Sequence, residues 1–232
     1  MKLEGVQKNY DRAAQRYDKW TDLVFGRILG VEGLREHTIE LLGDIDGKVV
    51  LDISCGTGRN FPFLVQRVGP RGRVIGVDYS RGMLDVARAR VERAGWRNVE
   101  LEQDDAAKLR TIESLVDAVV SVWCMGIVHD LDAALYRAVD VLRPRGRIAI
   151  MDFDRARPDH GWLHCFFPVY SRVLQWAGID SAEDLDDDRL REKWKSGRQI
   201  LERRIDHLEE ERYLGGGGMI LSGIAPAHEE RT

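Results

Sequence analysis

Residues 49–60 read VVLDISCGTGRN, and this stretch decides the fold. It starts with a β-branched, apolar run between turn residues, which is typical of a buried strand. A bend of small residues with Gly56 and Gly58 follows, and we expect a helix to begin near Arg59 or Asn60. Such a strand, bend and helix bring bare backbone N–H groups and the positive helix end together. This combination indicates a ligand site at the carboxyl end of a parallel strand.

The composition is that of an ordinary soluble protein. Hydrophobic residues make up 44% and charged residues 32% of 232 residues, with a net charge of −4, which argues against a disordered chain and against nucleic-acid binding. We expect no secretory signal, because the first residues include acids and lack an apolar segment, and no transmembrane segment, because no run of about 18 apolar residues occurs. We therefore predict one cytoplasmic domain spanning residues 1–232, for which peripheral membrane contact stays open.

Three cysteines, Cys55, Cys124 and Cys165, are far apart in the sequence. An odd number without a CxxC spacing predicts neither a disulfide framework nor a metal site. We interpret each of them as a small buried residue.

Short apolar runs alternate with amphipathic helical stretches through the centre of the chain. Helices are expected at 80–95, between a serine N-cap and a glycine stop, and at 130–142. Such alternation predicts an α/β fold with right-handed crossovers and a parallel sheet covered by helices on both faces. The predicted strands are residues 48–53, 73–78, 98–103, 117–125 and 146–153.

The two ends of the chain depart from this alternation. Two extended runs flank a GGGG turn near the C-terminus and predict an antiparallel hairpin. We expect two or three helices before the first strand, and a charged amphipathic helix over residues 184–197. The predicted parts are an N-terminal helical cap (1–45), a cofactor-binding core (46–153), a helical insertion on the substrate side (154–200) and the hairpin (201–226).

Three strand ends carry groups that suit a nucleoside. Asp78 follows Gly58 by one strand and helix, where a carboxylate accepts hydrogen bonds from ribose hydroxyls. Asp105 ends the third strand and is suited to an adenine amino group, while Ala106 offers a backbone N–H to the ring. Together these residues predict one bound adenosine.

The nature of the nucleoside's tail separates two hypotheses. A dinucleotide fingerprint needs a third glycine for close packing around a pyrophosphate, and Phe61 occupies that position. Asp52 suits a positively charged ammonium better than a diphosphate. S-adenosylmethionine (AdoMet) combines adenosine with a sulfonium and an amino acid tail, so we favour it over a nicotinamide cofactor.

These motifs together resemble the class I AdoMet-dependent methyltransferases, within the group of ubiquinone/menaquinone-biosynthesis C-methyltransferases and bacterial phospholipid N-methyltransferases. The resemblance implies a Rossmann-like, mostly parallel sheet of order 3-2-1-4-5-7-6 with an antiparallel last strand, and no metal. It runs from about residue 10 to residue 226 and rests on these segments: VLDISCGTGRN, VIGVDYSRGMLDVARAR, QDDA, DAVVSVWCMGIVHD, LRPRGRIAIMDF and the glycine hairpin.

The resemblance also implies which residues bind the cofactor. It places the methionine portion on the glycine bend, the ribose on Asp78 and the adenine between Tyr79 and Met83. An N-terminal motif would close over the cofactor through Tyr10 and Tyr17, although two tyrosines on one helical face can simply pack. The full predicted set is Tyr10, Tyr17, Asp52, Ser54, Gly56, Gly58, Asn60, Asp78, Tyr79, Met83, Asp105, Ala106 and Trp123.

Some positions depart from the pattern of the resembled group or allow two interpretations. Ser54 replaces the usual first glycine of the bend, which is tolerable if its backbone angles are ordinary. Trp123 either walls the cofactor site or packs beneath it. Two weak candidates for a general base are His129, which can equally be a loop residue before a helix, and Asp152, which can equally cap the following turn.

Methyl transfer from a sulfonium needs alignment and exclusion of water more than a catalytic dyad. We therefore expect an enzyme that methylates a small-molecule or lipid acceptor in line. The aromatic residues of the insertion indicate a bulky or apolar acceptor such as a quinone carbon, a phosphatidylethanolamine nitrogen or a secondary-metabolite oxygen. The alternatives are a nicotinamide-dependent oxidoreductase and an AdoMet-binding protein without catalysis.

Overall fold

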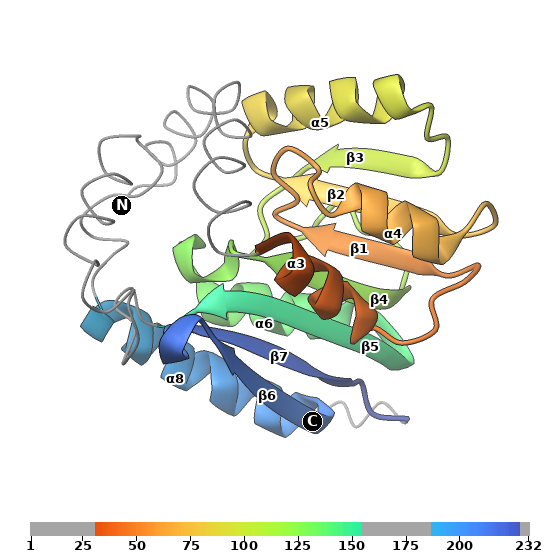
Figure 1. The fold of residues 1–232 in the computed structure, drawn as a ribbon. Helices are drawn as coiled ribbons and strands as arrows, with labels where there is room; N and C mark the ends of the chain where they lie inside the picture. The colour runs from red at the N-terminus through yellow and green to blue at the C-terminus, as the bar shows by residue number, and fades with distance from the viewer. Residues whose placement is uncertain (1–30, 155–186, 228–232) are drawn as a thin grey trace.

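A computed structural model describes residues 31–154 and 187–227, which form a seven-stranded sheet with helices packed on it (Figure 1). The strand order is β3-β2-β1-β4-β5-β7-β6, which confirms the predicted Rossmann-like order. The strands are β1 (Val49–Ile53), β2 (Arg73–Asp78), β3 (Val99–Gln103), β4 (Val116–Val122), β5 (Leu142–Phe153), β6 (Asp206–Tyr213) and β7 (Gly218–Ile224).

The strand order reverses at β1, which lies in parallel between β2 and β4. In this register Asp52 is opposite Gly76 on one side and Val120 on the other. Only β7 runs against its neighbours, β5 and β6, as the glycine-rich hairpin predicted. The glycine bend therefore lies at the topological switch point, where open α/β sheets bind ligands.

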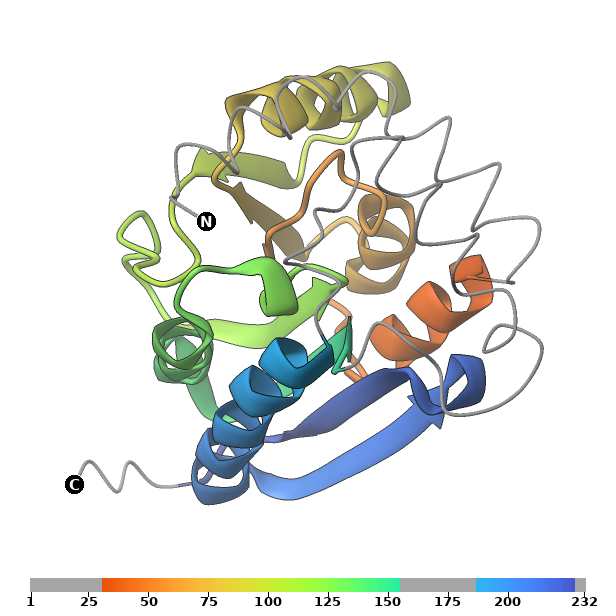
Figure 2. The same ribbon diagram turned by 90° about the vertical axis from the view of Figure 1, so that its left-hand side faces the viewer.

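Helices cover both faces of the sheet, as predicted (Figures 1 and 2). Helices α3, α4 and α5 cover the face that carries Val50 and Val120, whereas α6 and α8 cover the face that carries Leu51 and Val119. The helices are α3 (Val31–Glu40), α4 (Phe61–Val68), α5 (Arg81–Ala94), α6 (Leu131–Asp140) and α8 (Asp187–Arg204), with short 3₁₀ turns η2 (Met125–Ile127) and η3 (Leu214–Gly216).

Helix α5 begins and ends where its caps predict. The Ser80 hydroxyl accepts a hydrogen bond from the Met83 N–H at 3.1 Å, and Gly95 ends the helix in the left-handed conformation with φ of 69°. Both groups satisfy backbone positions that a helix leaves unpaired at its ends.

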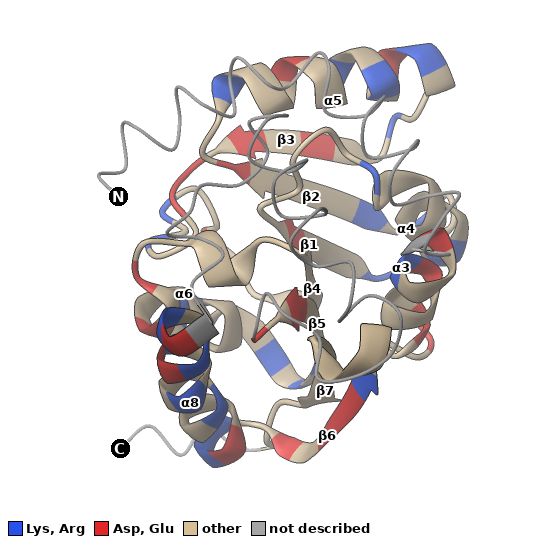
Figure 3. Ribbon diagram, turned by 60° about the vertical axis from the view of Figure 1, so that its left-hand side comes forward, with Lys and Arg blue, Asp and Glu red and all other residues tan. Residues whose placement is uncertain are grey.

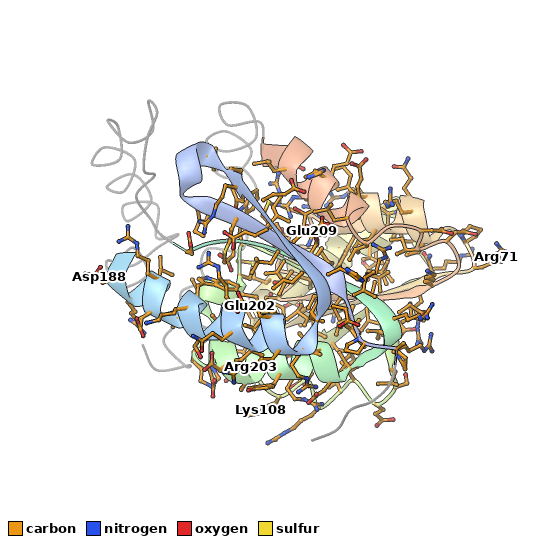
Figure 4. The ribbon with its side chains drawn as sticks, turned by 90° about the horizontal axis from the view of Figure 1, so that it is seen from below. Arg71, Lys108, Asp188, Glu202, Arg203 and Glu209 are labelled. Atoms are coloured by element: carbon orange, nitrogen blue, oxygen red, sulfur yellow. The ribbon has the colours of Figure 1, made fainter. Side chains whose placement is uncertain are left out.

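Helix α8 is longer than predicted. The prediction that it ends at Gly197 is wrong, because the helix continues to Arg204. A Cβ at position 197 would lie 2.8 Å from Leu135 of α6, so this glycine allows two helices to approach closely. Acidic and basic residues alternate along α8 (Figure 3), with Asp188 near one end and Glu202 and Arg203 towards the other (Figure 4).

Strand β4 is shorter than the predicted 117–125. It ends at Val122, and the next residue, Trp123, has a left-handed backbone with φ of 57°, outside the β region of backbone angles. Met125, predicted in the strand, instead begins η2. The chain therefore turns at the carboxyl edge of the sheet, beside the bend.

An ion-pair network ties α8 to the edge of the sheet. The buried Asp154 carboxylate accepts hydrogen bonds from Arg198 at 2.6 Å and from Arg212 at 2.8 Å, and Arg198 also reaches Glu210 at 3.0 Å. Because Arg198 lies on α8 while Glu210 and Arg212 lie on β6, the network fixes the helix against the hairpin.

Several predictions fall outside the described residues. They concern Tyr10 and Tyr17, Cys165 and most of the 154–200 insertion with its aromatic residues. In the described ranges, no helix combines the length and the apolar character that crossing a bilayer requires.

Candidate functional site

Asp52 lies near the end of β1 with its side chain fully buried. Its Oδ1 accepts a hydrogen bond from the Asn60 amide at 2.8 Å, whereas Oδ2 has no partner among the described residues. Burial raises the pKa of Asp52 to about 7, and the charge of Asp78 adds to this, against the hydrogen bond from Asn60 and the charge of Arg35. A buried carboxylate oxygen without a partner is destabilising on its own. A cationic group is therefore what this position would bind best.

The bend joins β1 to the end of β2. The N–H of Gly56 donates to Asp78 Oδ2 at 2.8 Å, and the N–H of Ser80 donates to Asp78 Oδ1 at 2.8 Å. Gly56 has φ of 55°, and a Cβ there would meet nothing within 4 Å. Asp78 thus holds the bend at an open glycine, and its carboxylate is an acceptor at the carboxyl end of β2.

Gly58 also has a packing role that the sequence did not predict. A Cβ at Gly58 would lie 2.5 Å from two ring carbons of Phe61, and a Cβ at Gly76 would lie 2.7 Å from the same ring. The Gly58 N–H donates to the Cys55 carbonyl oxygen at 3.0 Å. Here two glycines make room for Phe61, the first residue of α4, so the close packing of helix on strand uses Gly76 of β2 instead of a third glycine in the helix.

Ser54 does not have the ordinary backbone angles under which a serine would be tolerated in place of the usual glycine. Its φ of 55° is left-handed, so the serine occupies a conformation that favours glycine and carries about 1 kcal/mol of strain. Its carbonyl oxygen accepts a hydrogen bond from the Cys124 thiol at 3.3 Å. This contact links the bend to the end of β4.

Asp105 and Ala106 follow β3 at the same edge of the sheet, and both are buried. The Asp105 carboxylate accepts hydrogen bonds from Lys108 Nζ at 2.6 Å and from the Ala107 N–H at 3.0 Å. Burial raises the pKa of Asp105, but these hydrogen bonds and the charges of Lys108 and His129 outweigh it, so the pKa lies below its usual range. Asp105 is therefore an ionised acceptor.

Tyr79 and Met83 lie at the beginning of α5, with Tyr79 just before the helix and Met83 in its first turn. Tyr79 is half-buried and follows β2 directly, whereas the Met83 side chain is buried. Both lie within the turn that Asp78 and Ser80 fix. Contact of these two residues with an adenine stays a prediction.

Trp123 is tied to the far side of the site. Its indole N–H donates to the Tyr213 hydroxyl at 2.8 Å, and that hydroxyl donates to the Asp152 carbonyl oxygen at 3.0 Å. The Arg35 guanidinium lies 5.0 Å from the Trp123 ring centre. Arg35 also donates to Asn60, whose amide reaches Asp52. The cofactor-side acid and the far edge of the sheet are thus joined through α3.

The two candidate bases differ sharply in environment. His129 is exposed in the loop before α6. Asp152 is buried, and its Oδ2 accepts the Gly126 N–H at 2.8 Å, so it holds η2, which precedes it in the chain, and not the turn that follows it. Burial raises the pKa of Asp152 to about 7, against backbone hydrogen bonds and the charge of Lys193. Whether Asp152 or His129 acts as a general base stays a prediction.

The structure also brings in residues that the sequence analysis did not select. Arg35 lies beside Asn60 and Trp123, and Lys193 donates to the carbonyl oxygens of Gly126 and Val128 at 2.9 and 3.0 Å. Trp194 is fully buried near Gly126. For Trp194, the only signal in the sequence is an apolar residue at helical spacing among charged ones, which indicates a core position. No sequence signal separates Arg35 from a surface arginine.

The sheet order with an antiparallel β7, and a glycine bend with an acid on each of β1 and β2, define the class I methyltransferase fold. A family model described as a methyltransferase domain matches residues 50–146.

Three relatives with curated names were compared. The demethylmenaquinone methyltransferase of Listeria welshimeri is 30% identical over 75% of this chain and 72% of its own length. The ubiquinone/menaquinone biosynthesis C-methyltransferase UbiE of Saccharophagus degradans is 31% identical over 81% and 75%. The demethylmenaquinone methyltransferase of Lactococcus lactis is 28% identical over 74% of this chain, which spans 64% of that relative. The chain belongs to this family of AdoMet-dependent methyltransferases.

Solved structures agree in fold. The N-methyltransferase NodS of Bradyrhizobium japonicum, in complex with S-adenosyl-L-homocysteine (AdoHcy), has a TM-score of 0.62 at 15% identity and covers 95% of this chain and 98% of its own. An AdoMet-dependent methyltransferase of Aquifex aeolicus has a TM-score of 0.58 at 21% identity and covers 82% and 89%. These structures show the shared fold. Because the chain belongs to the methyltransferase family above, its cofactor is AdoMet, and the nicotinamide alternative is not supported.

Proposed function

We propose that this chain binds AdoMet over the glycine bend and methylates a quinone-like acceptor. The observation that carries the cofactor assignment is the buried Asp52 carboxylate, whose Oδ2 has no partner among the described residues. When bound, AdoMet supplies a methyl group attached to a sulfonium sulfur. The thioether that leaves is neutral, so its departure needs no acid catalyst. The remaining work of the protein is to bind, orient and exclude water.

In this proposal each predicted residue has a separate task. Asp52, held by Asn60, accepts hydrogen bonds from the ammonium of the methionine tail, and Asp78 accepts them from the ribose. Ser54, Gly56 and Gly58 shape the bend. Asp105 and Ala106 bind the adenine edge between Tyr79 and Met83. Trp123 closes the far side, and Tyr10 and Tyr17 cover the cofactor.

The names of the relatives support the proposed acceptor. The curated relatives are named for demethylmenaquinone and for ubiquinone or menaquinone biosynthesis, which supports a quinol ring as the methylated group. We propose a single-domain enzyme in the cytoplasm that meets this apolar acceptor at the membrane surface, with no nucleic-acid partner.

Methyl transfer to a reduced quinone is the direct test of the acceptor. The purified chain is incubated under nitrogen with AdoMet and demethylmenaquinol, and the product is analysed by mass spectrometry. We expect a product heavier by one methylene and an equal amount of AdoHcy. Methylation of phosphatidylethanolamine vesicles with no reaction on the quinol would replace this acceptor by a lipid nitrogen.

Cofactor binding is expected to weaken in acid. With a pKa of about 7 in the free protein, Asp52 must lose its proton before it can pair with an ammonium. Affinity for AdoHcy, measured by calorimetry, should fall by about tenfold between pH 7 and pH 5.5. Asp52→Asn should remove this dependence, and Asp152→Asn should keep it. An affinity that is flat over this range in the unmodified chain would contradict the role of Asp52.

The same pKa shift makes an opposite prediction for the ligand-free fold. A carboxyl with a raised pKa contributes stability that is present below its unfolded value of 3.8 and is lost as pH rises through about 7. The ligand-free chain should therefore melt at a lower temperature at pH 8 than at pH 5, whereas AdoHcy should raise the melting temperature more at pH 8.

A further inference from the structure

Trp194 carries a buried polar group that the fold leaves without a partner. The side chain lies on α8 and is fully buried, and its indole N–H makes no hydrogen bond with any described residue. A buried tryptophan usually finds a partner for this N–H. An unsatisfied N–H in such a place points to a group that the structure does not hold.

Asp152 supplies an acceptor at the same place. It is buried, and Oδ1 accepts the N–H of the adjacent Phe153 at 2.7 Å. One carboxylate oxygen accepts two hydrogen bonds. Oδ1 therefore keeps capacity for a second donor.

Gly126 brings the donor and the acceptor to one point. A Cβ at position 126 would lie 3.5 Å from Trp194 Nε1, 3.5 Å from Asp152 Oδ1 and 3.4 Å from Leu190 Cδ2. The backbone here is fixed on both sides, because Asp152 Oδ2 accepts the Gly126 N–H and Lys193 donates to the Gly126 carbonyl oxygen. A donor and an acceptor thus face the same side of a clamped glycine.

The location suits the acceptor half of the reaction. Gly126 follows β4 and Asp152 ends β5, at the same carboxyl edge as the bend, but Asp152 lies on the face of the sheet that α6 and α8 cover. Asp52 faces α3 and α4 instead, where it bonds to Asn60. The two buried acids therefore serve opposite faces of one edge.

We propose that Asp152, Trp194 and Gly126 form a subsite for a ring hydroxyl of the methyl acceptor. Trp194 Nε1 donates to the hydroxyl oxygen, and the hydroxyl donates to Asp152 Oδ1. Because Gly126 has no side chain, the hydroxyl oxygen takes about the place of the missing Cβ, in ordinary contact distance of Trp194 Nε1 and Asp152 Oδ1. This inference rests on the proposed function and deepens it, because it names the group by which the acceptor is recognised.

The subsite also moves one proton. The O–H bond of the ring hydroxyl breaks, the proton passes to Asp152 Oδ1, and the electron pair stays on the ring oxygen. The Trp194 N–H then stabilises the negative oxygen. The pKa of about 7 places Asp152 near neutrality, where a general base works best. An oxyanion on the ring raises the electron density of the neighbouring ring carbon.

A matched pair of probes tests the subsite by binding. Naphthohydroquinone has the two ring hydroxyls, and its dimethyl ether has the same ring without a donor. Each is titrated under nitrogen into the chain saturated with AdoHcy, by calorimetry. We expect the unmodified chain to prefer the hydroquinone by about tenfold.

Three substitutions should remove this preference. Asp152→Asn removes the carboxylate, Trp194→Phe removes the N–H, and Gly126→Ala places a methyl at ordinary contact distance between them. Each should bring the two probes to nearly equal affinity while AdoHcy affinity stays unchanged. Gly126→Ala decides the matter if Trp194→Phe fails to fold. Trp96→Phe and Gly33→Ala are the matched controls, since Trp96 is outside this region and a Cβ at Gly33 meets nothing within 4 Å.

Two results would overturn the subsite. One is a preference for the hydroquinone that survives in Gly126→Ala and Asp152→Asn, which would leave the proposed methylation of a quinol standing. The other is the absence of hydroquinone binding to the unmodified chain. The proposed function fails separately, if demethylmenaquinol receives no methyl group although the probes bind with the expected preference.

Discussion

Gly58→Ala should lower the free energy of unfolding by about 3 kcal/mol and the melting temperature by about 10 °C. The new methyl would meet two penalties at once. Gly58 has φ of 77°, and a Cβ there would lie 2.5 Å from the ring of Phe61. The ring cannot move aside, because it is fully buried and lies against the α-carbon of Gly76.

Gly56→Ala is the matched control for that substitution. Gly56 has φ of 55°, so alanine is also strained there, but a Cβ meets nothing within 4 Å. Its cost should be about 1 kcal/mol. Urea unfolding of both variants measures the difference. Equal costs at the two positions would show that crowding by Phe61 contributes nothing and that the account of the bend is wrong.

Asp78→Ala should weaken AdoHcy binding by about 2 kcal/mol, or roughly thirtyfold. The substitution removes the acceptor proposed for the ribose, and it also releases the N–H groups of Gly56 and Ser80, which Asp78 holds at 2.8 Å each. The bend then loses its attachment to β2. Calorimetric titration with AdoHcy measures the effect.

Asp78→Asn separates the two roles of this side chain. An amide keeps one oxygen as acceptor and should hold part of the bend, so its loss of affinity should be smaller than that of alanine. Asp85→Asn, at an exposed position of α5, is the control and should bind AdoHcy as the unmodified chain does. An Asp78→Ala variant with unchanged affinity would remove the ribose from this strand end.

Patterns that depend on local chemistry could be read from the sequence. The range of β2, the caps of α5 and the antiparallel hairpin follow from β-branched runs, a serine N-cap and glycine turns, and the structure has them. Full strand order came from the resemblance of several motifs together. Periodicity alone does not specify which strands are neighbours.

Features that depend on packing between distant segments could not be read. Gly197 has the signature of a helix end, yet it allows α8 to approach Leu135. Gly76 of β2, which no motif singled out, makes room for the Phe61 ring at the beginning of α4. The left-handed Ser54 has no local signal, because serine rarely adopts such a backbone.

The ionisation of the buried acids was equally hidden. Asp52 and Asp152 each look like ordinary strand-end carboxylates, but burial raises the pKa of each to about 7, and the charge of Asp78 adds to this at Asp52. The buried Trp194 indole N–H, which has no hydrogen-bond partner among the described residues, results from how α8 packs over Gly126. Charge and burial at these positions are set by the whole fold.

A crystal structure of the chain grown with AdoHcy tests the central claim most directly. The account predicts the amino group of the ligand within hydrogen-bond distance of Asp52 Oδ2 and the ribose hydroxyls on Asp78. The contrary result is a ligand bound elsewhere, or an Asp52 carboxylate that pairs with a side chain of its own chain while the bend stays empty.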